Sequence, residues 1–244
     1  MPLTIAHPVA VLPFKKIGLP LAALIAGSMA PDLEHFLYLA PRSDFSHTLP
    51  GLFLFSLPAG AVLLWFFCRL WLPAAQSFCS LPANGLFVPP RHFLRIGLGI
   101  LLGSVTHIIW DAFTHEYGFA VLRLPALSAT VWDGHWYALP VFKILQHGSG
   151  LLGLGILGLL ALRHRRQWPV LPRRTLVVLA AALFLAALLA LASVLIQRGL
   201  PTAIRGLGKY LGATIVRFAF ITLAGATLLG LTRHFRIDRT PDKP

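Results

Sequence analysis

Six long apolar runs dominate this sequence and restrict the fold that it can adopt. Each run is close to the roughly 20 residues that a helix needs to cross a bilayer, where only helices and closed barrels satisfy their backbone hydrogen bonds. Hydrophobic residues make up 57% of the chain and charged residues only 12%. We therefore predict an all-α, polytopic membrane helix bundle with about six transmembrane helices. The runs are residues 17–39, 51–72, 94–116, 139–162, 176–196 and 210–231, and the first is broken by Pro31 and Asp32.

The basic residues indicate how such a bundle lies in its membrane. The net charge is +13, but Lys and Arg lie almost entirely in short segments between the apolar runs. This pattern is explained by the positive-inside rule and by contact with anionic lipid, so the positive charge does not indicate a nucleic-acid partner. The densest cluster is the linker 163–174, which holds five arginines. We place this linker and both termini in the cytoplasm, although the basic loop 198–209 then falls on the outer side.

The third apolar run carries three potential metal ligands in a row. His107, Asp111 and His115 are spaced four residues apart, so they share one face of a helix. Ionisable groups are expensive inside a membrane, and the row therefore indicates a binding site. The structural alternative is a buried hydrogen-bonded pair, His107 with Asp111, that fixes helix packing. Trp110 is assigned to the aromatic belt at the membrane interface.

Counting along the chain places polar groups of three runs at one depth. In each run the polar residue lies 16 residues, or about 24 Å of helix, from the innermost basic residue. The pairs are Asp32 with Lys16, Asp111 with Arg95, and His147 with Arg163. The loop after the first run adds Glu34, His35 and His47 on the same outer side. Taken singly, Asp32 could instead cap a short helix after Pro31, and His147 could simply begin a glycine-rich helix.

Histidine and carboxylate ligands suit zinc, manganese or iron(II), and zinc is our first choice. Cys68 and Cys79 show no CxxC spacing, so no thiolate pair is indicated. The candidates outnumber the four ligands of one tetrahedral site, which leaves both one ion and two ions open. A bound metal ion can activate water and polarise a phosphoryl or acyl group. We assign the catalytic carboxylates as Glu34, our first choice for a general base, and Asp111.

Five motifs occur in order along roughly residues 1–155: MPLTIAHPVAVLP, LPLAALIAGSMAPDLEHFLYL, SHTLPGLFLFSLP, GSVTHIIWDAFTHEYG and ILQHGSG. This ordered set resembles the bacterial membrane family catalogued as domain of unknown function 4184. That family is similar to inner-membrane-associated, predicted metal-dependent hydrolases, which show His, Pro-Asp-x-Asp-His, His and His-x-x-x-Asp elements. Glu34 stands here where that pattern has its second Asp. The resemblance adds His7 to the candidate ligands, which are then His7, Asp32, His35, His47, His107, Asp111, His115 and His147.

The position of His7 conflicts with a simple six-span arrangement. His7 precedes Lys16 by nine residues and would therefore lie on the cytoplasmic side, away from the other candidates. A short apolar helix over residues 4–14 that runs down from the site and turns at 15–18 resolves the conflict, because it forms a hairpin with the next segment. Pro13 and Pro20 around that turn are compatible with this hairpin. The alternative is that His7 only flanks an amphipathic entry segment.

These features divide the chain into a metal-site membrane domain (1–162), a basic cytoplasmic linker (163–174) and a C-terminal transmembrane pair with a basic tail (175–244). We expect a multi-pass protein of the bacterial inner membrane that acts as a metal-dependent hydrolase near the outer face, with membrane lipids around it and a lipid or phosphoester as substrate. The alternative is a non-catalytic transporter or metal sensor that uses the same polar cluster. No inverted repeat is visible between the two halves, which disfavours a transport path.

Overall fold

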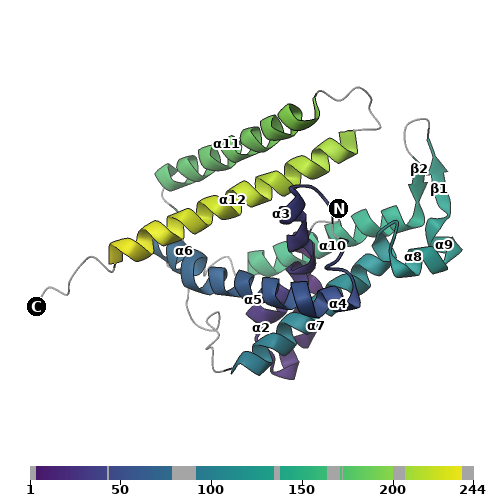
Figure 1. The fold of residues 1–244 in the computed structure, drawn as a ribbon, viewed down its shortest axis with the longest axis horizontal. Helices are drawn as coiled ribbons and strands as arrows, with labels where there is room; N and C mark the ends of the chain where they lie inside the picture. The colour runs from purple at the N-terminus through teal and green to yellow at the C-terminus, as the bar shows by residue number, and fades with distance from the viewer. Residues whose placement is uncertain are drawn as a thin grey trace, which may run out of the picture.

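The computed structural model describes residues 4–42, 44–78, 92–134, 138–163, 171, 173–199 and 207–237 of this chain. Nearly all of these residues are helical (Figure 1). The predicted basic linker lies largely outside the described residues, as do Cys79 and the last residues of the basic tail. The division into three domains therefore stays a prediction.

In the part of the chain that the structure describes, five helices are long and apolar enough to cross a membrane. The first is continuous from α4 (Leu49–Gly51) through the π-helical turn η4 (Leu52–Ser56), α5 (Leu57–Phe66) and a second π-helical turn η5 (Phe67–Trp71) to α6 (Leu72–Phe78). The others are α7 (Phe93–Thr114), α10 (Val141–Arg163), α11 (Arg173–Arg198) and α12 (Leu207–Ile237). Pro50, Pro58 and Pro73 lie in the first helix, and its π-helical turns are a usual way for a helix to absorb such irregularities.

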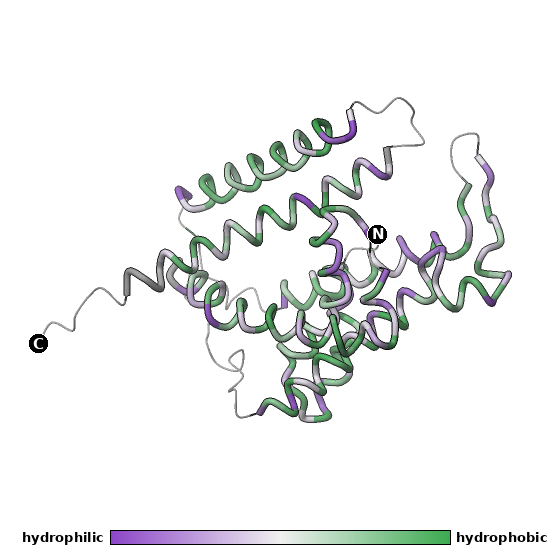
Figure 2. The backbone as a smooth tube through the Cα atoms, viewed as in Figure 1, coloured by the Kyte–Doolittle hydropathy of each residue, from purple (hydrophilic) through white to green (hydrophobic). Residues whose placement is uncertain are grey.

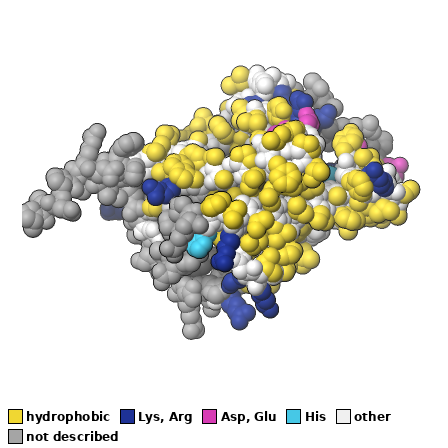
Figure 3. Space-filling model, turned by 60° about the horizontal axis from the view of Figure 1, so that its bottom comes forward, with side chains coloured by type: hydrophobic (Ala, Val, Ile, Leu, Met, Phe, Trp, Pro, Cys, Tyr) yellow, Lys and Arg dark blue, Asp and Glu magenta, His cyan; other side chains and the backbone are white. Residues whose placement is uncertain are grey.

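The surface of these helices is apolar. Hydrophobic residues follow most of the length of α11 and α12 (Figure 2). Hydrophobic side chains also cover most of the described part of the face in Figure 3, where Lys and Arg lie at several places near its margins. Large side chains such as Leu151, Leu159 and Phe184 are about two-thirds exposed, which suits lipid but not water. The chain is therefore a multi-pass membrane protein, and the predicted all-α bundle is confirmed.

The first apolar run does not form a sixth continuous span. Residues 4–17 form the short helices η1 (Thr4–Ala6), α1 (Pro8–Val11) and η2 (Leu12–Ile17), and the chain then reverses at Gly18, whose φ of 79° is left-handed. It returns as α2 (Leu21–Met29), a 3-10 turn η3 (Pro31–Leu33) and α3 (Glu34–Tyr38). Pro31 has no backbone N–H for the α-helical ladder, so the helix changes pitch there. The expected count of about six spans becomes five among the described residues, and the predicted N-terminal hairpin is present.

Helices α2 and α7 form the core that positions the site. Their closest approach is at glycines: a Cβ on Gly103 would lie 2.2 Å from the Leu24 carbonyl oxygen, and one on Gly27 would lie 2.1 Å from that of Ile100. At this crossing the Ser104 hydroxyl donates a 3.0 Å hydrogen bond to the Gly27 carbonyl oxygen. Backbone contact of this kind is the usual way in which membrane helices pack tightly. This backbone contact fixes the position of α7 along the axis of α2.

Smaller elements close the end of the bundle at which α7 finishes. After α7 come α8 (Phe119–Arg123), α9 (Pro125–Ser128) and an antiparallel pair of strands, β1 (Thr130–Asp133) and β2 (Ala138–Pro140). On another side α12 packs against α3, where the buried guanidinium of Arg217 donates to the Leu39 carbonyl oxygen, the Ser193 hydroxyl and the Gln197 side-chain oxygen. The bond to Leu39 joins the C-terminal pair to the segment that carries the site, and the other two hold α12 against α11.

Candidate metal centre

Three segments bring four predicted ligands together. Asp32 lies in η3, His47 in the loop before α4, and His107 and Asp111 one turn apart on α7. One ligand atom from each of the four lies within 4.8 Å of the others. His107 is fully buried, and the side chains of Asp32 and Asp111 are 8% and 9% exposed. The structure thus contains a His/Asp group that could hold a metal ion.

The orientation of His107 is set by the backbone of α2. Its Nδ1 lies 2.7 Å from the Ser28 carbonyl oxygen, so Nδ1 carries the proton and donates it. Its Nε2 then faces two carboxylates, at 3.2 Å from Asp111 Oδ2 and 3.5 Å from Asp32 Oδ1, and forms no hydrogen bond. A neutral imidazole turns a lone pair toward those oxygens, and this arrangement is repulsive unless a cation, either a proton on Nε2 or a metal ion, lies between them. Metal-bound histidines have this second-sphere bond from the other nitrogen.

The loop that carries His47 is held by Glu34. The Glu34 carboxylate is 2% exposed and accepts hydrogen bonds from the backbone N–H groups of Phe45 (3.2 Å) and Ser46 (2.7 Å). Although burial opposes ionisation, these bonds hold the pKa of Glu34 below its ordinary value. His47 then places Nε2 3.2 Å from Asp111 Oδ2, while its Nδ1 contacts the Ser46 hydroxyl. The contacts favour a positioning role for Glu34, and the predicted catalytic role stays a prediction.

Asp32 is oriented by two neighbours. His35 places Nε2 3.1 Å from Asp32 Oδ1 and Nδ1 2.8 Å from the Arg42 carbonyl oxygen. Although burial opposes protonation, hydrogen bonding to Asp32 raises the pKa of His35. The Thr4 hydroxyl donates to the other carboxylate oxygen of Asp32. His35 therefore contacts a ligand and lies outside the group of four, whereas we predicted it as a ligand itself.

His7 and His115 approach the same centre from the other side of Asp111. The ring of His7 stacks on that of His107 with 3.9 Å between centroids, and its Nε2 lies 3.6 Å from Asp111 Oδ1. His115, at the end of α7, places Nδ1 3.3 Å from the same oxygen. The N-terminal hairpin thus brings His7 to the site, and the ligand role that the family resemblance implied stays a prediction.

His147 is not brought into the group. It lies on α10 with its side chain exposed, whereas the buried face of that helix presents Gln146, Gly150 and Gly153. The side chain of His147 therefore does not point toward the buried face of α10.

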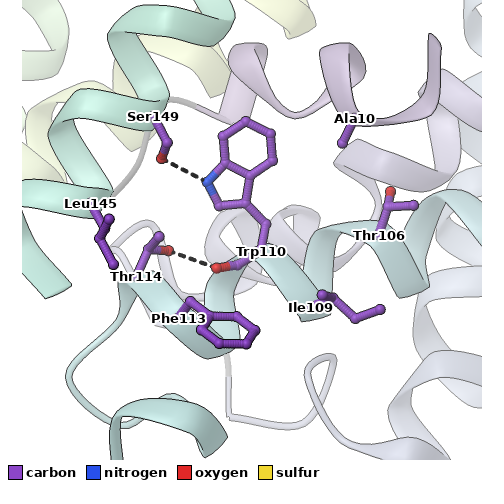
Figure 4. Close-up of a pocket in the computed structure, with 8 residues that line it drawn as sticks. All are labelled: Ala10, Thr106, Ile109, Trp110, Phe113, Thr114, Leu145 and Ser149. Carbon is purple, nitrogen blue, oxygen red and sulfur yellow. Dashed lines mark hydrogen bonds between the residues drawn. The ribbon is translucent and has the colours of Figure 1, made fainter. Parts of the chain in front are cut away.

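Trp110 has a more specific place than the interfacial belt that we predicted. Its indole N–H donates a 3.0 Å hydrogen bond to the Ser149 hydroxyl of α10, and its ring lies 5.1 Å from that of His7 between centroids. Beside it is an open groove of about 400 Å³ (Figure 4). The groove is lined by Ala10, Thr106, Ile109, Trp110, Phe113, Thr114, Leu145 and Ser149. One aromatic ring therefore separates an apolar groove from the polar cluster.

Unpaired buried atoms test whether the cluster suits a metal ion. Buried polar atoms are normally hydrogen-bonded, and each exception requires an explanation. Among the described residues, the unpaired buried side-chain atoms include both ring nitrogens of His7, Nε2 of His107 and Oδ1 of Asp111. These four atoms belong to histidine or carboxylate, the donor types that borderline divalent metals prefer, and the fifth such atom is the amide nitrogen of Gln146 on α10. The residues present therefore fit a divalent transition metal ion.

Comparison with known proteins adds a family. A family model described as "Domain of unknown function (DUF4184)" matches residues 1–232. The match extends well beyond the roughly 155 residues of the predicted resemblance and includes α11 and most of α12. No match was found among curated proteins or among solved structures.

Proposed function

Since this chain belongs to the family Domain of unknown function (DUF4184), whose description names no reaction, we propose its function from the site itself. The proposed function is that of a membrane-bound, metal-dependent hydrolase that acts on a lipid or a phosphoester. The observation that carries this proposal is the arrangement around Asp111 and Asp32. Nitrogen atoms of buried imidazoles face carboxylate oxygens there without hydrogen bonds, at a position where ligand atoms of four residues converge.

Asp32, His47, His107 and Asp111 would hold the ion, and zinc is our first choice, with manganese or iron as alternatives. When bound, such an ion activates water and polarises the phosphoryl or acyl oxygen of a substrate. The chain's own residues prepare the ligands. The Ser28 carbonyl fixes the tautomer of His107, Glu34 holds the His47 loop, and His35 orients Asp32.

The polar cluster lies at one end of the bundle, which supports a hydrolytic site over a transport path. Lys15 and Lys16 lie in η2 near the turn of the N-terminal hairpin, and Arg95 lies in the first turn of α7, whereas the cluster lies at the other end of both elements. By the positive-inside rule the basic end faces the cytoplasm and the site faces outward. The expected cytoplasmic N-terminus does not fit this orientation, because Thr4 contacts Asp32 at the site. The expected cytoplasmic C-terminus is kept in the proposal.

The groove beside Trp110 supports a lipid as substrate. It is formed mainly by α7 and α10, two helices that can span the membrane, so we expect the groove to face the hydrocarbon region of the bilayer. A volume of about 400 Å³ is within the usual range for small-molecule sites. An acyl chain in this groove would bring a polar head group toward the cluster behind the ring of Trp110.

The direct test is hydrolysis by purified protein in liposomes of defined lipid composition. We expect metal-dependent release of a product, detected by mass spectrometry, from the wild-type protein and from a His147→Ala control, and none from His107→Ala. A wild-type protein that binds metal but leaves every lipid and soluble phosphoester intact would overturn the catalytic proposal.

A further inference from the structure

We propose that Asp111 bridges two metal ions, and that a second divalent transition metal ion is held by Asp111 Oδ1, His7 and His115. This inference rests on the metal site proposed above, and it assigns a different set of ligands. The first ion would use Asp111 Oδ2 with Asp32, His47 and His107.

The two oxygens of Asp111 face different pairs of imidazoles. Oδ2 lies 3.2 Å from Nε2 of both His47 and His107. Oδ1 lies 3.6 Å from Nε2 of His7 and 3.3 Å from Nδ1 of His115. Despite these neighbours, Oδ1 is buried and accepts no hydrogen bond. A carboxylate with two imidazole nitrogens beside each oxygen has the arrangement of a bridging ligand.

His7 supplies the independent observation. Its side chain is 1% exposed, and neither ring nitrogen has a hydrogen-bond partner. Burying polar atoms without hydrogen-bond partners is costly, because those atoms lose their bonds to water and gain none in return. The first ion does not remove this cost, because the four residues that converge on it do not include His7. A second ion at Nε2 of His7 removes part of it and explains why the N-terminal hairpin buries a histidine here.

His115 completes the second set and opens it toward the surface. It is the residue at which α7 ends, and its side chain is 33% exposed. Its Nδ1 also lies 3.3 Å from the Thr114 hydroxyl oxygen. Because that hydroxyl donates its proton to the Trp110 carbonyl oxygen at 3.0 Å, it can only accept from Nδ1, and a metal ion at Nδ1 would replace this contact. The second set therefore has three protein ligands, and the first has four. Three protein ligands would leave a position open for water or substrate at the second ion.

The test is metal stoichiometry in full-length protein purified in detergent, stripped and then reconstituted with Mn²⁺. Elemental analysis gives the equivalents per chain, and electron paramagnetic resonance distinguishes isolated Mn²⁺ from a coupled pair. We expect two equivalents and a coupled signal in the wild-type protein. His7→Phe, which keeps a ring against His107, and His115→Ala should each retain one equivalent with an isolated signal. His147→Ala, with an exposed histidine replaced, should keep two.

The outcomes separate this inference from the proposed metal site. A single wild-type equivalent that survives in His7→Phe and is lost in His47→Ala overturns the second ion and leaves the first. No bound metal in the wild-type protein overturns both. Should His7→Phe and His115→Ala both fail to fold, the wild-type spectrum decides, because an isolated signal at saturation contradicts a bridged pair.

Discussion

Replacing Gly103 with alanine tests how the contact between α2 and α7 positions His107. A Cβ there would lie 2.2 Å from the Leu24 carbonyl oxygen and 2.7 Å from the Ser28 nitrogen, both backbone atoms that cannot rotate away. Ordinary contact begins near 3.4 Å, so the two helices must separate by about 1.2 Å. Overpacking of this kind costs roughly 1–3 kcal/mol.

The same separation acts on the site. The bond from His107 Nδ1 to the Ser28 carbonyl oxygen is 2.7 Å long, and lengthening it by about 1.2 Å would bring it to about 3.9 Å, beyond hydrogen-bond range. Loss of a second-sphere bond of this type typically weakens metal affinity about 10- to 100-fold. We therefore expect Gly103→Ala to lower both the thermal unfolding temperature and the metal affinity.

Gly97→Ala is the matched control for this experiment. It is the same substitution on the same helix, but its nearest neighbour is the Leu57 Cδ1 atom at 4.0 Å. Thermal unfolding in detergent, followed by tryptophan fluorescence, and competition with a chelator for the metal measure the two effects. Equal unfolding temperatures and equal metal affinities in the two variants would refute the argument from helix contact.

Three further predictions concern residues around the site. Glu34→Gln should weaken metal affinity about 10- to 100-fold, measured by chelator competition, because a neutral amide holds the His47 loop less well. The pKa of Glu34 is lower in the folded state than its ordinary value of 4.5. The ionised side chain therefore stabilises the fold above pH 4.5, and this stabilisation is lost as the pH falls through the folded pKa. The difference in unfolding temperature between Glu34→Gln and the wild type should accordingly shrink in acid. Arg217→Met should destabilise the docking of α12 by roughly 0.6–2 kcal/mol, seen as a lower unfolding temperature with unchanged metal content, because its bonds join helices and contact no ligand. Trp110→Ala should reduce turnover of a long-chain lipid more than that of a short-chain analogue, and equal losses would argue against a chain in the groove.

The sequence predicted the ligands best where local spacing fixes geometry. The four-residue spacing of His107 and Asp111 determines a shared helix face, and α7 directs that face at one centre. His115 follows α7 as its extended C-cap and still reaches Asp111 Oδ1. The conflict between the implied role of His7 and the position of Lys16 led to a hairpin, which the structure contains.

Other features depend on tertiary contacts that spacing cannot show. Depth counting gave His147 the same height as Asp111, but height leaves the direction around the helix open, and α10 exposes that side chain. The carboxylate of Glu34 was expected in the chemistry, yet it binds loop amides that follow it by 11 and 12 residues. Arg217 was missed, although an ionisable residue inside an apolar run is a signal that could have found it.

The central claim is that the cluster around Asp111 binds a transition metal ion. Elemental analysis of protein purified without chelators tests it most directly, with Asp111→Asn as the comparison, since asparagine keeps the shape of the side chain and removes its charge. We expect at least one transition metal ion per wild-type chain and a large loss of metal in a folded Asp111→Asn variant. Wild-type protein without bound metal, or equal metal content in both proteins, would contradict it.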